Sequence, residues 1–427
     1  MAFAEWMIPT ERPAGSGAHG AAAALRGTCF AGLIVGAVLF GVAVSCLRVG
    51  AAEDKQANSQ DPVSNLPLKA RLALFKAQEK RDKGEYGEAA KILYDFLAKH
   101  PRDDNYLVRY SLALSYTDAG ELAKALDHFQ KCVTFDSTFA PAWMKLGETA
   151  FNLGSYRIAS DAFMRGYALD ERKSPDLLYY AATAYYLAGD APRALPILKG
   201  LVSGERGAPR IEWFRTYLAA CNDAKEIEMG REAASRLVTI FPGDPEAWRL
   251  IYQYYASVKE YREAAAALTV VGYLRPLSRD EARTLGDLYT AVGIPALASA
   301  QYEAALGEAG RTEDFERLAS AYLASYNFDG ALETLERAIE KEPTVRLWSL
   351  LGDLHLMERH YERAYEAYQR CAEMDSTRGR PDLMMGYCAY ELGRIQDAVA
   401  HLERASSFPE QERTALDLLN RVRPANR

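Results

Sequence analysis

Six histidines are the residues of this 427-residue chain that first suggest metal or acid–base chemistry. Metal sites usually take their ligands from a compact spacing, such as two histidines one helical turn apart. His355 and His360 are five residues apart, which does not place both imidazoles on one helical face. Both are expected near a turn, and we expect no metal pair there. The others are scattered: His19, His100, His128 and His401.

Cysteines could supply thiolates, but their spacing points to packing. Two of the six lie in an apolar N-terminal segment, and the other four, Cys132, Cys221, Cys371 and Cys388, are far apart. No Cys-x-x-Cys pair occurs, so neither a zinc site nor a redox dithiol is indicated. We expect the four to be small buried residues. A Cys371–Cys388 bridge would require an oxidising compartment, and spacing alone does not decide it.

One glycine motif resembles a nucleotide-binding loop. Residues 15–20 read GSGAHG, but the dinucleotide pattern needs a preceding strand and a following helix, and here a targeting segment follows. Serine-hydrolase elbows, Walker loops, kinase signatures and His-Glu-x-x-His are absent from the sequence. We therefore expect a protein that is not an enzyme and that binds no cofactor.

Composition indicates a soluble, folded body. Hydrophobic residues make up 49% and charged residues 26% of the chain, and the net charge is −7. The absence of a basic stripe argues against nucleic-acid binding.

Residues 1–51 are expected to be a targeting device. Residues 29–47 form an apolar run, preceded by Arg12 and Arg26 and closed by Arg48. Its length suits a bilayer span or the core of a secretory signal. A cleaved signal, an uncleaved anchor in the inner membrane and a lipoprotein acylated at Cys46 remain open. Each would export the body, which in a Gram-negative bacterium means the periplasm. Residues 52–69 read as a polar linker.

The remaining chain reads as helix, because apolar residues recur at steps of three and four. Within it one pattern returns about every 34 residues. Its best copy contains, in order, Trp143, Leu146, Gly147, Gly154, Tyr156, Ala159 and Phe163. The copies are expected to begin at Ala70, Tyr106, Ala140, Pro175, Ile211, Pro245, Arg279, Thr312, Val345 and Gly379.

This pattern resembles the tetratricopeptide repeat family over residues 70–423. The resemblance implies an all-α fold: an α-solenoid, a right-handed superhelix of about ten helical hairpins. Residues 412–422 are expected to form a capping helix with charged residues facing water. Small residues on both helices of each hairpin should allow close approach.

The repeats divide the body into three parts. Residues 70–210 contain repeats one to four, and residues 245–423 contain repeats six to ten and the capping helix. Residues 211–244 form a divergent fifth repeat without a clear turn glycine. It follows a Gly/Pro-bearing patch at residues 203–209, and we expect a hinge in this region.

The family resemblance also implies a binding groove lined by each first helix. Its positions are the second, fifth, ninth and twelfth of each repeat. They suggest an aromatic N-terminal portion and an Arg-rich centre, suited to a protein segment with apolar anchors and an acidic part. The alternative is that these side chains are half-buried structural residues or solvated charges. The predicted residues are Tyr110, Leu114, Met144, Phe151, Tyr179, Tyr186, Arg215, Asn222, Arg249, Gln253, Arg283, Asp287, Asp353, Leu383, Tyr387 and Tyr390. No ninth position holds Asn, so the carboxylate clamp of chaperone-binding relatives is not expected.

The C-terminal half resembles a narrower group. Residues 245–423 are similar to periplasmic tetratricopeptide proteins of bacterial TonB–ExbB–ExbD systems, notably in the Gly293-Ile294-Pro295 turn followed by Ala298. This similarity implies an exported scaffold that couples an inner-membrane motor to outer-membrane transport. The alternatives are a general envelope-assembly scaffold, for lipoproteins, pili or exopolysaccharide, and a non-catalytic subunit of an envelope enzyme.

Overall fold

The computed structural model describes residues 62–307 and 310–423. These residues form 21 α-helices and two short 3₁₀ helices, η2 (Pro62–Asn65) and η3 (Pro101–Asp103), and contain no strand. The expected targeting segment, 1–51, and residues 52–61 of the expected linker lie outside the described residues. Within the described ranges, every helix is too short or too polar to cross a bilayer.

The helices pair into ten antiparallel hairpins followed by one single helix, as the repeat pattern predicts. Nine of the ten first helices begin at the predicted residue, and the earliest begins two residues before it, at Leu68. The last helix, α24 (Glu412–Val422), covers the predicted capping segment and packs on the tenth hairpin. The all-helical repeat architecture is therefore confirmed.

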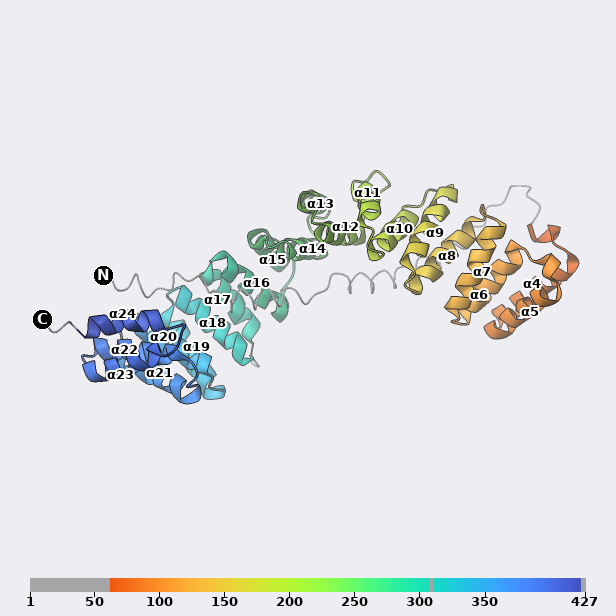
Figure 1. Cartoon of the computed structure of the whole chain (residues 1–427). Coiled ribbons are helices and arrows are strands. Elements are labelled where there is room, and N and C mark those ends of the chain that lie inside the picture. The colour runs from red at the N-terminus through yellow and green to blue at the C-terminus, as the bar shows by residue number, and fades with distance from the viewer. Residues whose placement is uncertain (1–61, 308–309, 424–427) are drawn as a thin grey trace. The chain divides into compact units, whose positions relative to one another are not determined.

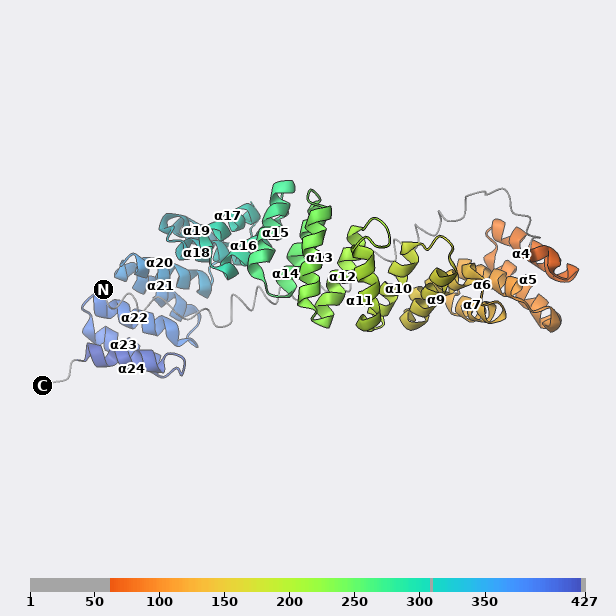
Figure 2. The same cartoon turned by 90° about the horizontal axis from the view of Figure 1, so that it is seen from above.

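The chain divides into two compact units, with the boundary between Pro242 and Gly243. The hinge expected in the fifth repeat and its preceding patch stays a prediction. In the first unit, five hairpins follow one another, and Figure 2 shows the two helices of the fifth side by side. Its helices are α4 (Leu68–Asp82), α5 (Tyr86–Lys99), α6 (Tyr106–Asp118), α7 (Leu122–Phe135), α8 (Ala140–Asn152), α9 (Tyr156–Leu169), α10 (Pro175–Leu187), α11 (Ala191–Val202), α12 (Ile211–Ala224) and α13 (Ile227–Ile240).

The second unit contains the other five hairpins and the capping helix (Figure 1). Each hairpin packs its second helix on the first helix of the next one, so the apolar faces are buried between neighbouring helices. The helices are α14 (Pro245–Ser257), α15 (Tyr261–Leu274), α16 (Arg279–Val292), α17 (Pro295–Leu306), α18 (Thr312–Ala324), α19 (Phe328–Lys341), α20 (Val345–Met357), α21 (Tyr361–Met374), α22 (Gly379–Glu391), α23 (Ile395–Ser406) and α24.

Small residues let the two helices of a hairpin approach closely. A Cβ added to Gly147 would lie 2.7 Å from Phe163 Cδ1, and one added to Gly286 would lie 2.5 Å from Tyr302 Cε1. The aromatic ring of the second helix thus occupies the space that a side chain on the first helix would need. Each second helix also carries an alanine that is fully buried, for example Ala159 or Ala331.

Every hairpin turn contains one residue in the left-handed region. Six of these ten residues are glycine, which adopts that conformation without strain. In the fifth hairpin the residue is Lys225 (φ 61°), so the turn that lacks a glycine has the same backbone. One residue later, a backbone N–H donates to the carbonyl five residues earlier, as Glu226 does to Cys221 (2.8 Å). This 6→1 bond satisfies a helix-end carbonyl.

Candidate functional site: the first-helix face, its polar network and its end

In the first unit, part of the predicted aromatic groove lies in the core. Phe151 and Tyr179 are 3% and 7% exposed, so they contribute packing. Tyr110 is half-buried, with its ring centroid 5.1 Å from that of Phe139. Met144 is also half-buried and would contact a Cβ on Gly166 at 3.3 Å. Leu114 packs against the same core from a partly exposed position.

Tyrosine hydroxyls join the first helices of neighbouring hairpins. Tyr186 on α10 donates to Asp223 on α12 (2.7 Å), and burial followed by this carboxylate raises the pKa of Tyr186. The Tyr179 hydroxyl lies 3.1 Å from Thr216 Oγ1. Arg215 and Asn222 lie on the same helix α12 and are partly buried. The binding role of these residues stays a prediction.

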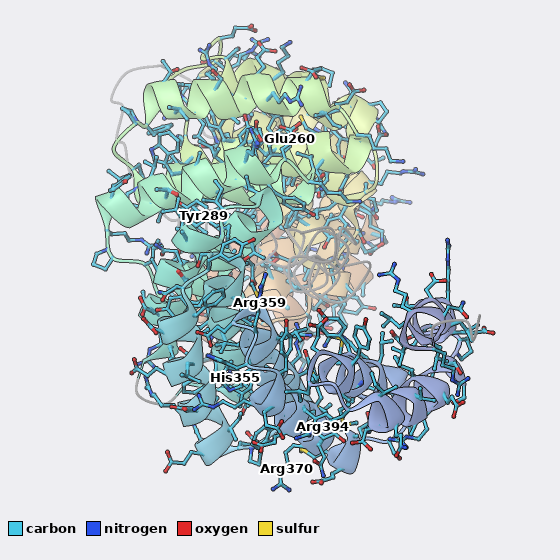
Figure 3. All side chains as sticks on the ribbon, turned by 90° about the vertical axis from the view of Figure 1, so that its left-hand side faces the viewer. Glu260, Tyr289, His355, Arg359, Arg370 and Arg394 are labelled. Atoms are coloured by element: carbon cyan, nitrogen blue, oxygen red, sulfur yellow. The ribbon has the colours of Figure 1, made fainter. Side chains whose placement is uncertain are left out.

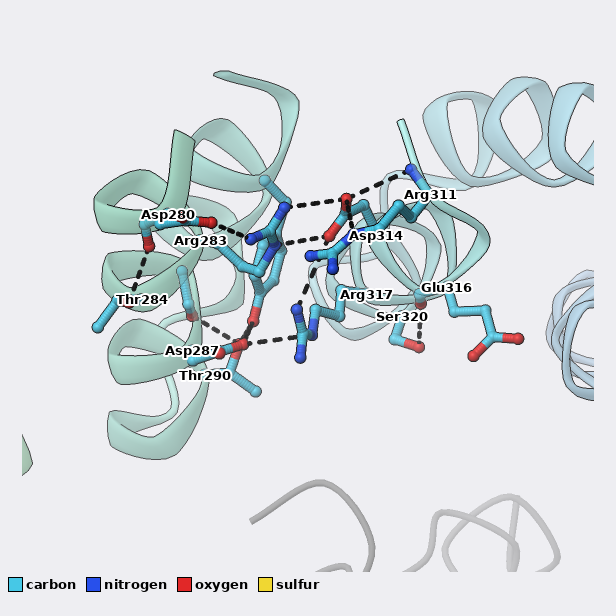
Figure 4. A network of polar contacts seen from close by, with 12 residues as sticks. Asp280, Arg283, Thr284, Asp287, Thr290, Arg311, Asp314, Glu316, Arg317 and Ser320 are labelled. Carbon is cyan, nitrogen blue, oxygen red and sulfur yellow. Dashed lines mark hydrogen bonds and ion pairs between the residues drawn. The ribbon is translucent and has the colours of Figure 1, made fainter. Parts of the chain in front are cut away.

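In the second unit, two predicted groove residues belong to a polar network between α16 and α18 (Figure 4). Arg283 donates to both oxygens of Asp314, from Nε at 2.7 Å and from Nη2 at 3.1 Å, and from Nη1 to Asp280 at 2.6 Å. The side chains of Arg283 and Asp314 are only 15% and 6% exposed. Burial alone would raise the pKa of Asp314, but the hydrogen bonds and charge of Arg283 hold it below its usual range.

Asp287 extends this network. It accepts a hydrogen bond from the Tyr302 hydroxyl (2.8 Å) and lies 3.6 Å from Arg317 Nε. Burial raises the pKa of Asp287 against the opposing charge of Arg317. Arg283 and Asp287 both form hydrogen bonds or ion pairs within the array. Replacing Arg283 by Glu would therefore disturb the packing of the repeats as well as the predicted binding groove.

The remaining predicted groove positions include residues with polar partners and residues that lie in the core. Asp353 accepts from Tyr368 and, at 2.7 Å, from Arg380 Nη2. Arg249 Nε lies 3.5 Å from Glu246, one turn away on α14. The core of the last hairpin contains three of them, buried or partly buried: Leu383, Tyr387 and Tyr390. Gln253 is partly exposed on α14.

Sequence reasoning missed Asp314, Arg317 and Arg380, which complete these networks. The position of Asp314 within its repeat could have indicated its role. It is the third residue of its repeat, a position where the first unit has the buried apolar residues Val108, Ala142, Leu177 and Trp213. A carboxylate at such a position indicates a buried partner.

The outer face of α4 carries an exposed apolar stripe. Leu68, Leu72 and Phe75 are 63%, 50% and 70% exposed, and their spacing of four and three places them on one helical face. Large exposed apolar patches usually mark interaction sites.

The turn between α20 and α21 contains both histidines, as the sequence predicted. His355 is on α20, Glu358 follows its end, and His360 precedes α21. The ring centroids of His355 and His360 are 6.1 Å apart. The two residues do not share one helical face, and the turn instead folds the chain back and brings their rings together. Burial and the charge of Arg363 lower the pKa of His355.

The four described cysteines are buried free thiols, as expected. No disulfide joins Cys371 to Cys388. Burial raises the pKa of Cys132, Cys221 and Cys388 to about 12 and that of Cys371 to about 11, so these sulfurs stay protonated and unreactive.

The tetratricopeptide repeat family model matches residues 76–138, 144–209 and 316–378. Together with the ten hairpins of the described residues, these matches support an all-helical tetratricopeptide repeat architecture. Proteins of this class are typically non-catalytic scaffolds that bind other proteins.

Among curated proteins, a TPR repeat-containing protein of Pseudomonas aeruginosa is 35% identical over 65 residues, covering 15% of this chain and 62% of the relative. The human Superkiller complex protein 3 is 24% identical over 354 residues, covering 69% of this chain and 22% of the relative. The chain thus spans less than two thirds of either relative. The crystal structure of MamA has a TM-score of 0.35 and 20% identity, covering 39% of this chain and 97% of that one.

Proposed function

We propose that this chain is an exported tetratricopeptide scaffold that binds a protein partner of the bacterial cell envelope. The observation that carries protein binding is the apolar stripe on α4. A partner that covers Leu72 and Phe75 would remove their apolar surface from water, and each such side chain contributes about 1.5–3 kcal/mol when fully buried.

The hairpins of the first unit indicate what this stripe accepts. Leu72 is the third residue of its repeat, and its equivalents Val108, Ala142 and Trp213 are at most 1% exposed. In each of these repeats, the second helix of the preceding hairpin packs on the first helix that carries the residue. Within the described residues, no hairpin precedes α4. The stripe is therefore suited to an amphipathic helix of the partner, docked as a preceding second helix would be.

Export is supported by the apolar run at residues 29–47 and its flanking arginines. The array would then act in the periplasm, either released or held at the inner membrane by this segment. Similarity of residues 245–423 to proteins of TonB-type systems makes TonB, ExbB or ExbD homologues the partners to test first.

A photo-crosslinking amino acid at Phe75, in the full chain in its native host, tests the docking surface. We expect one dominant envelope partner, and at least about tenfold less of it when Leu72→Glu is added, since that loss corresponds to about 1.4 kcal/mol. Tyr273, 84% exposed on α15, is the matched control position and should not capture this partner. Equal capture from both positions would refute docking on α4, and capture of cytoplasmic proteins alone would refute export.

A further inference from the structure

The turn between α20 and α21 holds two imidazoles and one carboxylate around a shared space. The His360 N–H donates to the His355 carbonyl (2.8 Å), and Arg359 adopts a left-handed φ of 62°. This backbone arrangement brings residues five apart next to each other. Figure 3 labels His355 and Arg359 at this turn.

The other turns provide an internal comparison. The same 6→1 bond joins Glu260 to Tyr255 and Arg394 to Ala389, each at 2.8 Å. Of the ten turns, the ninth is the one with histidine at both bonded positions. It is also the one with a carboxylate three residues after the first, at Glu358, where the other turns carry Lys, Ala, Leu, Val or Ser. The cluster is therefore a property of these side chains and not of the repeat.

The distances suit a small divalent cation. Glu358 Oε2 lies 3.9 Å from His355 Nδ1 and 3.5 Å from His360 Nδ1. One ligand atom from each residue lies within 4.8 Å of the others. Two ligands bound tetrahedrally to zinc are about 3.4 Å apart, from bond lengths of about 2.0–2.1 Å. Glu358 and His360 are partly or well exposed, so small side-chain rotations close the difference.

An independent observation also points to a ligand. His355 is 7% exposed, and its Nδ1 has no hydrogen-bond partner among the described residues. A buried polar atom without a partner destabilises the fold, because it has lost its hydrogen bonds to water and gained none in return. This nitrogen faces the Glu358 carboxylate from beyond hydrogen-bond distance, and a cation between them would satisfy both groups. Arg363 places a positive charge near His355, and Glu336 and Glu358 place negative charges near it.

We propose that His355, Glu358 and His360 form a zinc site. Two imidazoles and one carboxylate are a donor set that zinc takes, and they leave a fourth position for water or a partner's ligand. The ion would join the end of α20 to the start of α21 and fix the ninth turn. Because His360 and Glu358 reach solvent, the fourth position opens outward.

Calorimetric titration of the full, untagged chain with Zn²⁺ tests this proposal, using the wild type, His360→Ala and Glu358→Gln. Both variants change side chains outside the core, and circular dichroism without metal checks that they fold. His100→Ala, a partly exposed histidine at the end of α5, is the matched control. Co²⁺ absorption reports whether the bound ion is tetrahedral.

We expect one Zn²⁺ bound by the wild type and by His100→Ala. His360→Ala and Glu358→Gln should each weaken binding about 100-fold or more, because loss of even an outer partner of a metal ligand costs about 10–100-fold. Zinc affinity that is unchanged in both variants, or reduced equally by His100→Ala, would overturn the proposal. A wild type that binds no zinc would overturn it as well.

Discussion

Replacing Gly286 by Ala tests how the repeats pack. The Cβ would lie 2.5, 2.7 and 2.9 Å from three ring carbons of Tyr302. That ring cannot swing aside easily, because Tyr302 is 4% exposed and its hydroxyl donates to Asp287 at 2.8 Å. Overpacking a core costs about 1–3 kcal/mol, while Ala in place of a helical Gly recovers about 0.5–1 kcal/mol. We expect a net loss of about 1–2 kcal/mol.

Hydrogen exchange with mass spectrometry is the suitable assay, because a repeat array opens locally and need not unfold in one step. Peptides covering residues 279–306 should exchange about 5–30-fold faster in the variant. Gly87→Ala is the matched control, since its Cβ would meet nothing within 4 Å. That variant should exchange as the wild type or more slowly. If Gly286→Ala leaves α16 and α17 as well protected as in the wild type, then the ring of Tyr302 does not require a glycine at position 286.

Two further predictions concern turns and caps. Lys259 has φ 65°, and a left-handed backbone is strained in a residue other than glycine. Lys259→Gly should therefore raise the free energy of unfolding, measured by urea denaturation, by about 0.5–1 kcal/mol. An unchanged urea midpoint would count against strain at Lys259. Arg275 donates two hydrogen bonds to Glu281 and Ser278 donates one, and they lower the pKa of Glu281 from 4.5 to about 2. A lowered folded pKa stabilises the fold above pH 4.5, and this contribution disappears as pH falls towards 2, so Glu281→Gln should cost about 1–3 kcal/mol at pH 6 and little near pH 2. Equal losses at both values would show that the charge is irrelevant.

Periodicity predicted the helices well because each hairpin repeats the same packing problem. The starts at Tyr106 and Gly379 follow from small and large residues at fixed positions. Side-chain roles were harder to predict. Position within a repeat does not tell whether a tyrosine such as Tyr179 faces a groove or the next helix. Pairs such as Arg283 and Asp314 depend on two repeats at once, so a single-repeat pattern cannot contain them. The nearness of the two imidazoles was not predicted, because helical spacing rules do not apply across a turn.

The Arg283–Asp314 pair makes the seventh and eighth hairpins non-interchangeable. Asp314 occupies a buried position. Its hairpin is therefore stable only when the preceding hairpin provides a guanidinium at the position of Arg283. A hairpin with an apolar third residue would leave Arg283 with only the exposed Asp280 as its acceptor, and breaking a buried ion pair costs about 3–5 kcal/mol. Modules of similar shape could otherwise pair in a wrong order during folding or be duplicated by recombination. The buried pair therefore specifies which hairpin packs next to which.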